Sequence, residues 1–353
     1  MSKTGSLNYH GNSQSYYGDV LSGSSDLKTS ACCCAEAPPQ WLRGAIGRLP
    51  DEILTKFYGC GSPLPLALDG CVVLDLGCGT GRDVYTAAQF VGKEGMVIGV
   101  DLTSTQLKVG EKYRETLCHT FDLPTDAIRF AQGPMEDLGA LGIEDNSVDV
   151  VISNCVLNLC PDKPRVLGEI ARVLKPGGEL HFSDVFASRR LSNALRNDPV
   201  FHGECLGGAW YWEDFRRMLA DLGIPDYRIM SQEILKIEDS TMAAQTEGIR
   251  FDSATIRVFE IDSLEDRCED YGQLVTYKGS LAECPRIFEL DPYHRFEANR
   301  PTRVCGNSAA MLEETRFAKH FTIHGNRDEH FGLFTSGEGS GEMQQESPTG
   351  GCC

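Results

Sequence analysis

The sequence is poor in basic residues and has no long apolar run. Its 353 residues include 51 acidic and 33 basic side chains, giving a formal net charge of −18. Proteins that wrap nucleic acid or lie on an anionic membrane need a concentrated positive field, so this balance argues against both partners. No stretch reaches the roughly 18 apolar residues of a membrane-spanning helix, and residues 1–26 lack the apolar core of a signal peptide. We therefore expect a soluble, cytoplasmic protein.

Closely spaced Cys-x-x-Cys pairs are also absent, although cysteine itself is plentiful. The chain has 15 cysteines, an odd number in a sequence too long to depend on disulfides for its stability. Structural zinc sites usually take their ligands from such closely spaced pairs. The pattern favours free thiols in a reducing compartment and raises the question of their use.

The middle of the chain alternates between short apolar runs and helical patterns. The strand candidates are residues 72–74, 96–100, 128–131, 148–153 and 179–182. The helix candidates are residues 84–91, 104–117 and 166–174, preceded by a pattern at 40–58 that Pro50 interrupts. This alternation predicts the α/β class, with a mostly parallel sheet covered by helices on both faces.

We divide the chain into four parts. Residues 1–39 form a polar arm that carries Cys32-Cys33-Cys34, and residues 40–222 form the sheet-bearing domain. Residues 223–334 are expected to form a smaller α+β module, with strands at 258–261 and 274–277 and a helix at 311–321, covering the substrate side of the site. Residues 335–353 are rich in Gly, Ser, Glu and Gln, end in Cys352-Cys353 and are predicted to be disordered.

A glycine-rich turn joins the first predicted strand to the next helix. It reads Asp75-Leu76-Gly77-Cys78-Gly79-Thr80-Gly81, and glycines there let a ligand approach the backbone amides at the start of a helix. Asp101 ends the next strand, where an acid can accept hydrogen bonds from both hydroxyls of a ribose. A nicotinamide site would share both features. The Gly-x-Gly-x-Gly spacing and the opening Asp75 favour another nucleoside cofactor.

This pattern resembles the nucleoside-binding signature of the class I S-adenosylmethionine-dependent methyltransferases. The resemblance implies a Rossmann-like fold, S-adenosylmethionine as cofactor, and a third contact loop at Gly133-Pro134-Met135-Glu136. The cofactor-binding residues that it implies are Tyr58, Asp75, Gly77, Gly79, Gly81, Asp101, Leu102, Met135, Glu136 and Asn154.

The segment after the predicted strand 148–153 should face the reacting methyl group, because ligands in such folds lie at the carboxyl ends of the strands. It reads Ser153-Asn154-Cys155-Val156-Leu157-Asn158-Leu159. It lacks the Asn-Pro-Pro-aromatic motif of amino-methylating enzymes and the Pro-Cys pair of cytosine methyltransferases. A single cysteine stands there instead. Taken alone, Cys155 reads more readily as a small buried residue than as a ligand.

Other cysteines in the chain favour a ligand role for Cys155. Cys60 and Cys205 have glycine neighbours, so we expect unhindered, exposed thiols at both, and a further run of cysteines stands on the arm. Thiolates contributed by several separate loops suit a soft acceptor atom. The seven remaining cysteines between the arm and the tail carry no signal beyond filling space; they are Cys71, Cys78, Cys118, Cys160, Cys268, Cys284 and Cys305.

Over nearly its whole length the chain resembles the arsenite S-adenosylmethionine methyltransferases. The resemblance rests on residues 16–18, 26–29, 58–61, 75–83, 153–159 and 203–210. It implies that Cys155 and Cys205 bind trivalent arsenic, and we expect Cys60 to join them as a third ligand. It also implies that Cys60 and an arm cysteine serve the first methylation and thiol–disulfide cycling. Cys32 fits the arm position best, with Cys33 as the alternative, and a thiol reductant such as thioredoxin or glutathione is an expected partner.

Two other interpretations stay open at this point. One is a methyltransferase for an ordinary oxygen, nitrogen or carbon acceptor, in which the cysteines are incidental. The other is a thiol-rich protein that sequesters a metalloid or zinc on a methyltransferase scaffold that no longer catalyses. The intact glycine turn and Asp101 disfavour the second.

Overall fold

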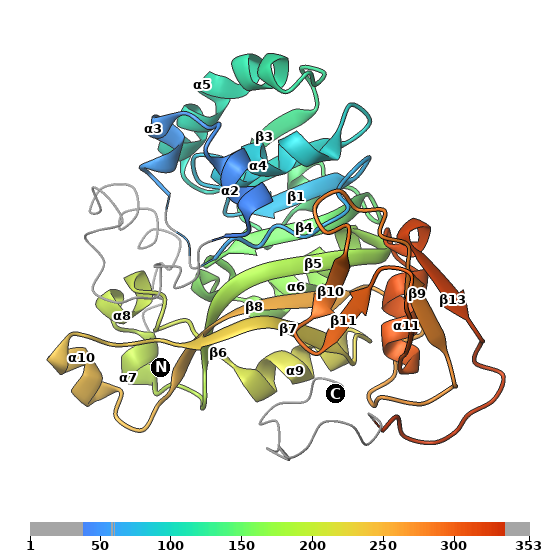
Figure 1. Ribbon diagram of the computed structural model, residues 1–353. Helices are drawn as coiled ribbons and strands as arrows, with labels where there is room; N and C mark the ends of the chain where they lie inside the picture. Colours follow the sequence, from blue (N-terminus) through green and yellow to red (C-terminus); the bar gives the residue numbers. More distant parts are fainter. Residues whose placement is uncertain (1–37, 58, 60, 336–353) are drawn as a thin grey trace.

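The computed structural model describes residues 38–57, 59 and 61–335, and an eight-stranded sheet forms its centre (Figure 1). The strand order is β3-β2-β1-β4-β5-β8-β7, with β6 paired to β5. The strands are β1 (Val72–Leu76), β2 (Met96–Asp101), β3 (Ile128–Gln132), β4 (Val148–Asn154), β5 (Leu174–Ala187), β6 (Trp210–Tyr211), β7 (Tyr227–Ile234) and β8 (Phe251–Phe259).

Strands β1 to β6 make parallel pairs, whereas β8 runs antiparallel to both β5 and β7. Helices lie on both faces of this sheet (Figure 1). The longer ones are α4 (Arg82–Val91), α5 (Ser104–Thr120), α6 (Lys163–Val173) and α9 (Trp212–Asp221). The short helices are α2 (Gln40–Ile46), α3 (Asp51–Leu54), α7 (Asn193–Arg196), α8 (Pro199–Gly203) and α10 (Ser240–Gln245), of which α7, α8 and α10 lie beyond the end of the sheet (Figure 1). The predicted α/β class with a mostly parallel sheet is confirmed.

Two hydrophobic cores explain why the central strands read as continuous apolar runs. Val73 of β1 belongs to the core that includes Val84 of α4 and Leu107 of α5. Its neighbour Leu74 belongs to the core that includes Ile170 of α6 and Phe215 of α9. Successive side chains of a strand point to opposite faces, so a sheet covered on both faces needs apolar residues at every position.

The sheet extends beyond the boundary expected at residue 222. The first half of the strand expected at 258–261, Val258 and Phe259, is the end of β8, and β8 pairs with β5 and β7 of the central sheet. The reason is long-range pairing: β8 adds antiparallel to an edge that the parallel strands leave open. The module proper therefore begins after β8.

The C-terminal module consists of two small antiparallel sheets and a helix. Strand β9 (Leu274–Tyr277) lies between β12 (Pro301–Arg303) and β13 (Phe321–His324), while β10 (Ile287–Asp291) pairs with β11 (His294–Glu297). The helix expected at 311–321 is wrong in extent, because α11 (Gly306–Glu313) ends before Phe317. Phe317 and Phe321 pack in a shared aromatic core with the strands instead of continuing a helical face.

The module packs against the amino-terminal half of β5. Glu179 of β5 is buried and forms ion pairs with Arg257 of β8, and with Arg316 at 2.6 Å. Burial opposes ionisation of Glu179, but the two guanidinium groups hold its pKa at about 2. A β-carbon on Gly177 would lie 2.1 Å from the carbonyl oxygen of Glu314. The described part of the module therefore meets the start of β5, at the right in Figure 1, which corrects the expectation that it covers the substrate side.

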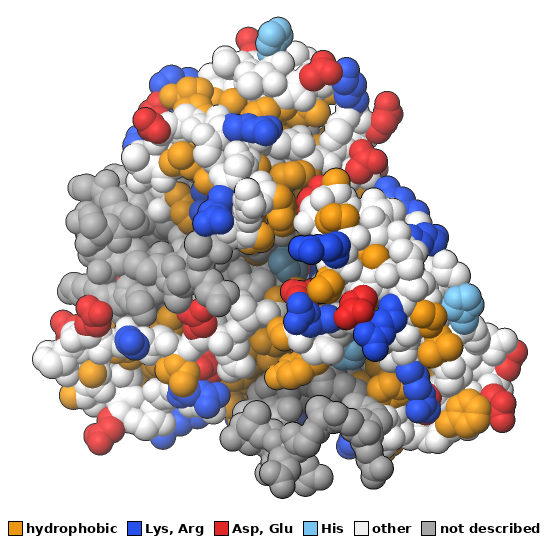
Figure 2. Space-filling view, in the orientation of Figure 1, with side chains coloured by type: hydrophobic (Ala, Val, Ile, Leu, Met, Phe, Trp, Pro, Cys, Tyr) orange, Lys and Arg blue, Asp and Glu red, His pale blue; other side chains and the backbone are white. Residues whose placement is uncertain are grey.

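Figure 2 shows lysine and arginine side chains mixed with acidic ones over the face in view. Exposed pairs such as Arg295–Glu289 (2.8 Å) and Arg300–Glu297 (3.0 Å) bring opposite charges together, and such pairs contribute little to stability. None of the helices in the described residues is long and apolar enough to cross a membrane.

Candidate active site

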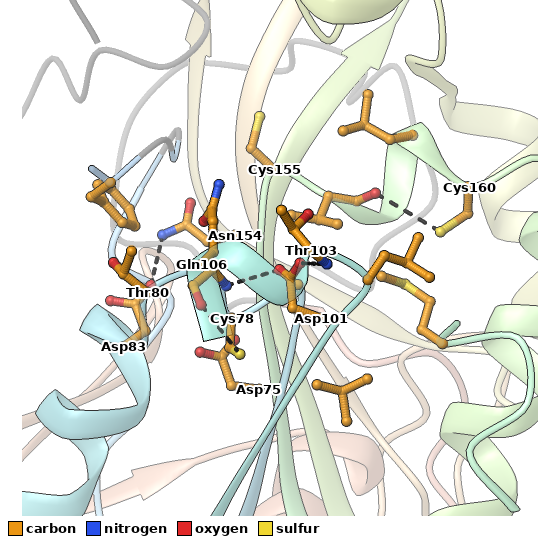
Figure 3. Close-up of a pocket in the computed structure, with 18 of the residues that line it drawn as sticks. Asp75, Cys78, Thr80, Asp83, Asp101, Thr103, Gln106, Asn154, Cys155 and Cys160 are labelled. Carbon is orange, nitrogen blue, oxygen red and sulfur yellow. Dashed lines mark hydrogen bonds between the residues drawn. The ribbon is translucent and has the colours of Figure 1, made fainter. Parts of the chain in front are cut away.

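A cavity of about 1020 Å³ opens at the carboxyl ends of β1, β2 and β4 (Figure 3). This is the edge at which ligands bind in open α/β sheets. Of the ten residues expected to bind cofactor, eight line the cavity: Asp75, Gly77, Gly79, Asp101, Leu102, Met135, Glu136 and Asn154. Tyr58 lies outside the described residues. Gly81 is not among the lining residues but stands at the N-cap of α4.

The glycine turn takes a backbone shape that few other residues accept. Gly77 has φ +74° and Gly79 has φ +55°, both in the left-handed region. A β-carbon on Gly77 would lie 2.5 Å from Cγ1 of Val156, and one on Gly79 would lie 2.7 Å from Oε1 of Gln106. The glycines therefore keep open the space between the turn, the end of β4 and the start of α5.

Four acids line this cavity, Asp75, Asp83, Asp101 and Glu136, and two of them border the glycine turn most directly in sequence: Asp75, which opens it, and Asp101, which bonds to it. Asp75 is buried, and its Oδ2 has no hydrogen-bond partner among the described residues. Burial, reinforced by Asp83 and Asp101, raises its pKa well above the usual range. Asp101 accepts hydrogen bonds from the amides of Gly79 (2.9 Å) and Thr103 (2.7 Å), and burial raises its pKa too. A ligand with a positive charge and hydroxyl donors would stabilise both carboxylates, which fits S-adenosylmethionine.

The sequence-based prediction missed several lining residues. Phe57, Thr103, Gln106 and Cys160 also border the cavity. Thr103 and Gln106 follow Asp101 closely in the chain, at the start of α5. Their position just after the predicted ribose-binding acid could have identified them as lining residues. Cys160 was read as filler, although it follows the cysteine-bearing segment by only a few residues, and burial raises the pKa of its thiol.

Cys155 and Cys205 come together although fifty residues separate them. Cys155 follows β4 and lines the cavity, and its amide donates to the carbonyl of Ser183 at 2.7 Å. Cys205 follows α8, and its Sγ lies 3.8 Å from the carbonyl oxygen of Cys155. Both residues have left-handed backbone, with φ of 59° and 62°. The fold thus brings two of the predicted arsenic ligands to one place.

The expectation that Cys205 stands in an unhindered loop is wrong. Cys205 is fully buried and Cys155 is only 4% exposed. A β-carbon on Gly207 would lie 2.9 Å from the amide nitrogen of His202, and one on Gly208 would lie 2.0 Å from the carbonyl oxygen of Asn158. These glycines allow the loop to pack tightly, and so they bury the thiol instead of exposing it.

Cys60 lies outside the described residues, but the glycine after it bonds to the side chain of Asn154, the residue before Cys155. The amide of Gly61 donates to Oδ1 of Asn154 (3.1 Å), and Nδ2 of Asn154 donates to the carbonyl of Gly61 (2.9 Å) and to Asp83 (3.0 Å). Arg82 adds a contact to the same carbonyl at 3.3 Å. The side chains of Asn154 and Arg82 therefore fix the position of Gly61.

Within the described ranges no group of three or more His, Cys, Asp or Glu side chains is placed to hold a metal ion. Cys32 and the neighbouring arm cysteines lie outside those ranges, as do Cys352 and Cys353. Of the four cysteines predicted to act, Cys155 and Cys205 are among the described residues, and Cys32 and Cys60 are not.

The sheet order, the glycine cradle, the buried Asp75 and the hydrogen-bonded Asp101 define an S-adenosylmethionine-dependent methyltransferase of class I. A family model described as "Methyltransferase domain" matches residues 67–223, and one described as "Arsenite methyltransferase C-terminal domain" matches residues 271–345. The chain belongs to the arsenite methyltransferase family.

Relatives of this family match the chain over most of its length. The arsenite methyltransferase of Aquipseudomonas alcaligenes is 49% identical over 325 residues, covering 92% of this chain and 93% of the relative. The human arsenite methyltransferase is 38% identical over 313 residues, covering 88% and 82%. The crystal structure of an arsenic(III) S-adenosylmethionine methyltransferase from Chlamydomonas reinhardtii aligns with a TM-score of 0.81 at 46% identity, covering 85% of this chain and 100% of that one.

Proposed function

We propose that this chain methylates trivalent arsenic, converting arsenite to methyl- and dimethylarsenicals with S-adenosylmethionine, and thereby serves arsenic detoxification. The observation that carries the proposal is the contact between Cys205 and Cys155, which lines the cofactor cavity: Sγ of Cys205 lies 3.8 Å from the Cys155 carbonyl. The names of the relatives support the choice of arsenic as the acceptor.

In this proposal the thiols of Cys60, Cys155 and Cys205 hold the arsenic. Each thiol replaces one hydroxide of arsenite, and its proton leaves with that hydroxide as water. Trivalent arsenic is soft and suits thiolate ligands. Because Cys155 and Cys205 are buried, the arsenic is held away from water and in a fixed place, which lowers the entropic cost of reaction.

The cofactor would be held by the glycine turn, Asp75 and Asp101, and when bound it supplies the methyl group to the arsenic lone pair. The acceptor is a lone pair and carries no proton that must be removed. No general base is therefore required, in contrast to hydroxyl or amine acceptors. The chain's contribution is to hold the arsenic and to exclude water.

Methylation formally oxidises trivalent arsenic by two electrons, so a reduction step must follow. The thiol of the arm cysteine, Cys32 or Cys33, attacks the sulfur of arsenic-bound Cys60. The S–S bond forms, the As–S bond breaks and leaves its electron pair on arsenic, and the attacking thiol releases one proton. A thiol reductant such as thioredoxin or glutathione then returns the disulfide to two thiols by exchange. The hydrogen bonds between Gly61, which follows Cys60 in the chain, and Asn154, which precedes Cys155, support the assignment of Cys60 to this site.

Incubation with arsenite, a thiol reductant and methyl-labelled S-adenosylmethionine, followed by separation of the arsenic species, tests the proposal. We expect label in methyl- and dimethylarsenicals. Arsenite binding without label transfer would instead indicate a sequestering protein. Cofactor binding without tight arsenite binding would indicate a methyltransferase for another small molecule.

Single cysteine-to-serine variants test the division of labour. Cys155→Ser and Cys205→Ser should lose methylation of both arsenite and methylarsenite, whereas Cys284→Ser, at a half-buried thiol in the C-terminal module, should keep both. Cys32→Ser and Cys60→Ser should slow the first methylation more than the second. Equal loss of both steps in these two variants would contradict their redox role.

A further inference from the structure

We propose that Asp184 and Asn158 are positioning residues that hold the loop of Cys205 against the segment of Cys155 and so set the geometry of the thiol pair. The inference rests on the proposed function, in which the thiols of Cys155 and Cys205 bind the arsenic. It concerns two residues for which the sequence suggested no role.

Asp184 lies in β5 and is completely buried. Its Oδ2 accepts hydrogen bonds from the amide of Asn158 at 2.9 Å and from Nε1 of Trp210 at 3.0 Å, and its Oδ1 accepts from the amide of Val185 at 2.8 Å. Asn158 stands three residues after Cys155, and Trp210 stands five residues after Cys205. A single carboxylate oxygen therefore connects the two cysteine-bearing segments.

Asn158 completes the connection from the other direction. Its Nδ2 donates to the carbonyl of Cys205 at 2.9 Å, and the side chain is almost fully buried. Cys205 has left-handed backbone, which a residue with a β-carbon adopts only when its surroundings impose it. The hydrogen bond from Asn158 fixes the orientation of the peptide group that follows this strained residue.

The adjacent residue of β5 holds Cys155. The carbonyl of Ser183 accepts a hydrogen bond from the amide of Cys155 at 2.7 Å. The Ser183 hydroxyl stands where a β-carbon on Gly61 would approach it to 2.3 Å. Ser183 and Asp184 thus contact Cys155, Asn158, Trp210 and Gly61 from one central strand.

The positioning role of Asn158 and Asp184 can be distinguished from a role in cofactor binding. Among the described residues that line the cofactor cavity, neither Asn158 nor Asp184 is present. Loss of either side chain should therefore alter arsenic binding and leave cofactor binding nearly unchanged. A general structural role would weaken both.

The test uses the full-length protein and the variants Asn158→Ala, Asn158→Asp, Asp184→Ala and Asp184→Asn. Asn158→Asp keeps the size but removes the donor to Cys205, and Asp184→Asn keeps an acceptor for Trp210. We expect the KM for arsenite to rise at least tenfold in both Asn158 variants and in Asp184→Ala, with partial rescue in Asp184→Asn. The dissociation constant for S-adenosylmethionine should change less than twofold.

Asp252→Asn is the matched control. Asp252 is a buried acid on the neighbouring strand β8, and Nε1 of Trp212 donates to its Oδ2 at 3.4 Å. It reproduces the acid–indole contact, with a tryptophan that begins α9, and it pairs with Arg250 at 3.1 Å where Asp184 bonds to Asn158. We expect its KM for arsenite to stay within twofold of the unaltered protein.

A readout without arsenic distinguishes failure of this inference from failure of the proposed function. Dibromobimane bridges neighbouring thiols, and peptide mapping measures the bridge between Cys155 and Cys205. We expect bridging to fall at least fivefold in Asn158→Asp, while cofactor binding shows that the variant is folded. Reduced bridging with an unchanged KM for arsenite would uphold the positioning role and contradict the arsenic site. Unchanged bridging and unchanged KM would overturn the positioning role.

Discussion

The site has two parts: a cofactor edge, formed by the glycine turn with Asp75 and Asp101, and a cysteine edge, formed by Cys155, Cys205, Asn158 and Asp184. Both contain residues with left-handed backbone, but the residue types differ. At the cofactor edge Gly77 and Gly79 have φ of 74° and 55°, a conformation that glycine adopts without penalty. At the cysteine edge Cys155 and Cys205 have φ of 59° and 62°, which costs a residue with a β-carbon about 1 kcal/mol. Glycine would be the easier residue there, so the side chains must be needed for their thiols.

The two edges also differ in their hydrogen bonding. At the cofactor edge the buried Oδ2 of Asp75 has no partner in the described part of the chain. At the cysteine edge Asp184 accepts three hydrogen bonds from backbone and indole donors. The first edge is built to receive a polar ligand, whereas the second is built to keep two protein segments in place.

The largest expected effect comes from replacing a cysteine of the cysteine edge by glycine, the residue that has left-handed backbone at the cofactor edge. Cys155→Gly and Cys205→Gly should each reduce methylation of methylarsenite more than 100-fold. Stability should change little, because relief of about 1 kcal/mol of backbone strain offsets the lost packing of the thiol. Rate assays and thermal unfolding measure both quantities. Cys118→Ala, at a buried cysteine of α5 outside the cavity, is the control and should keep its rate.

The converse change places a β-carbon at the cofactor edge. Gly77→Ala should weaken S-adenosylmethionine binding by about tenfold or more, because the new atom meets Val156 at 2.5 Å and φ is already strained. Gly70→Ala is a matched control: φ is 76°, and a β-carbon there would have no atom within 4 Å. It should cost only about 1 kcal/mol of stability. Isothermal titration calorimetry measures cofactor affinity in both variants. An equal loss of affinity in the two would show that the effect does not depend on the contact with Val156.

A third change tests the free carboxylate of the cofactor edge. Asp75→Asn should weaken cofactor binding by about tenfold, the order expected from one hydrogen bond to a charged group. Asp149→Asn provides the comparison, since Asp149 bonds the amide of Val72 and pairs with Lys175, at the amino ends of the strands. If isothermal titration finds the same affinity for Asp75→Asn as for the unaltered protein, Asp75 does not contact the cofactor.

The smallest expected effect is a pH dependence of stability at the cysteine edge. Burial raises the pKa of Asp184 from 3.8 to about 7. Between those values the folded state binds more protons than the unfolded state, so the contribution of Asp184 to stability decreases as pH rises. Relative to Asp184→Asn, the unfolding free energy should fall by about 1 kcal/mol per pH unit approaching pH 6. Denaturant titrations at pH 5, 6 and 7 that give parallel values for both proteins would contradict this.

The parallel strands and the glycine turn could be predicted because their signals are local. Apolar runs such as 148–153 reflect burial on both faces, and glycines after β1 reflect a turn with positive φ. The place of β8 could not be predicted, because an antiparallel strand joins this sheet through pairing with β5, about seventy residues earlier in the chain.

The cysteine pair shows the same limit more sharply. No spacing rule relates Cys155 to Cys205, and only the family resemblance brought them together. Glycines beside Cys205 suggested an open loop, yet Gly208 is there because Asn158 leaves no room for a β-carbon. Asp184 and Asn158 gave no sequence signal, since their role consists of contacts between segments distant in the chain.

X-ray absorption at the arsenic edge tests the central claim most directly. The full-length protein, loaded with one equivalent of arsenite under reducing conditions, is compared with Cys155→Ser, Cys205→Ser and the control Cys284→Ser. The account predicts one sulfur neighbour fewer around arsenic in each of the first two variants and an unchanged sulfur shell in the control. An unchanged sulfur shell in Cys155→Ser and Cys205→Ser would contradict it.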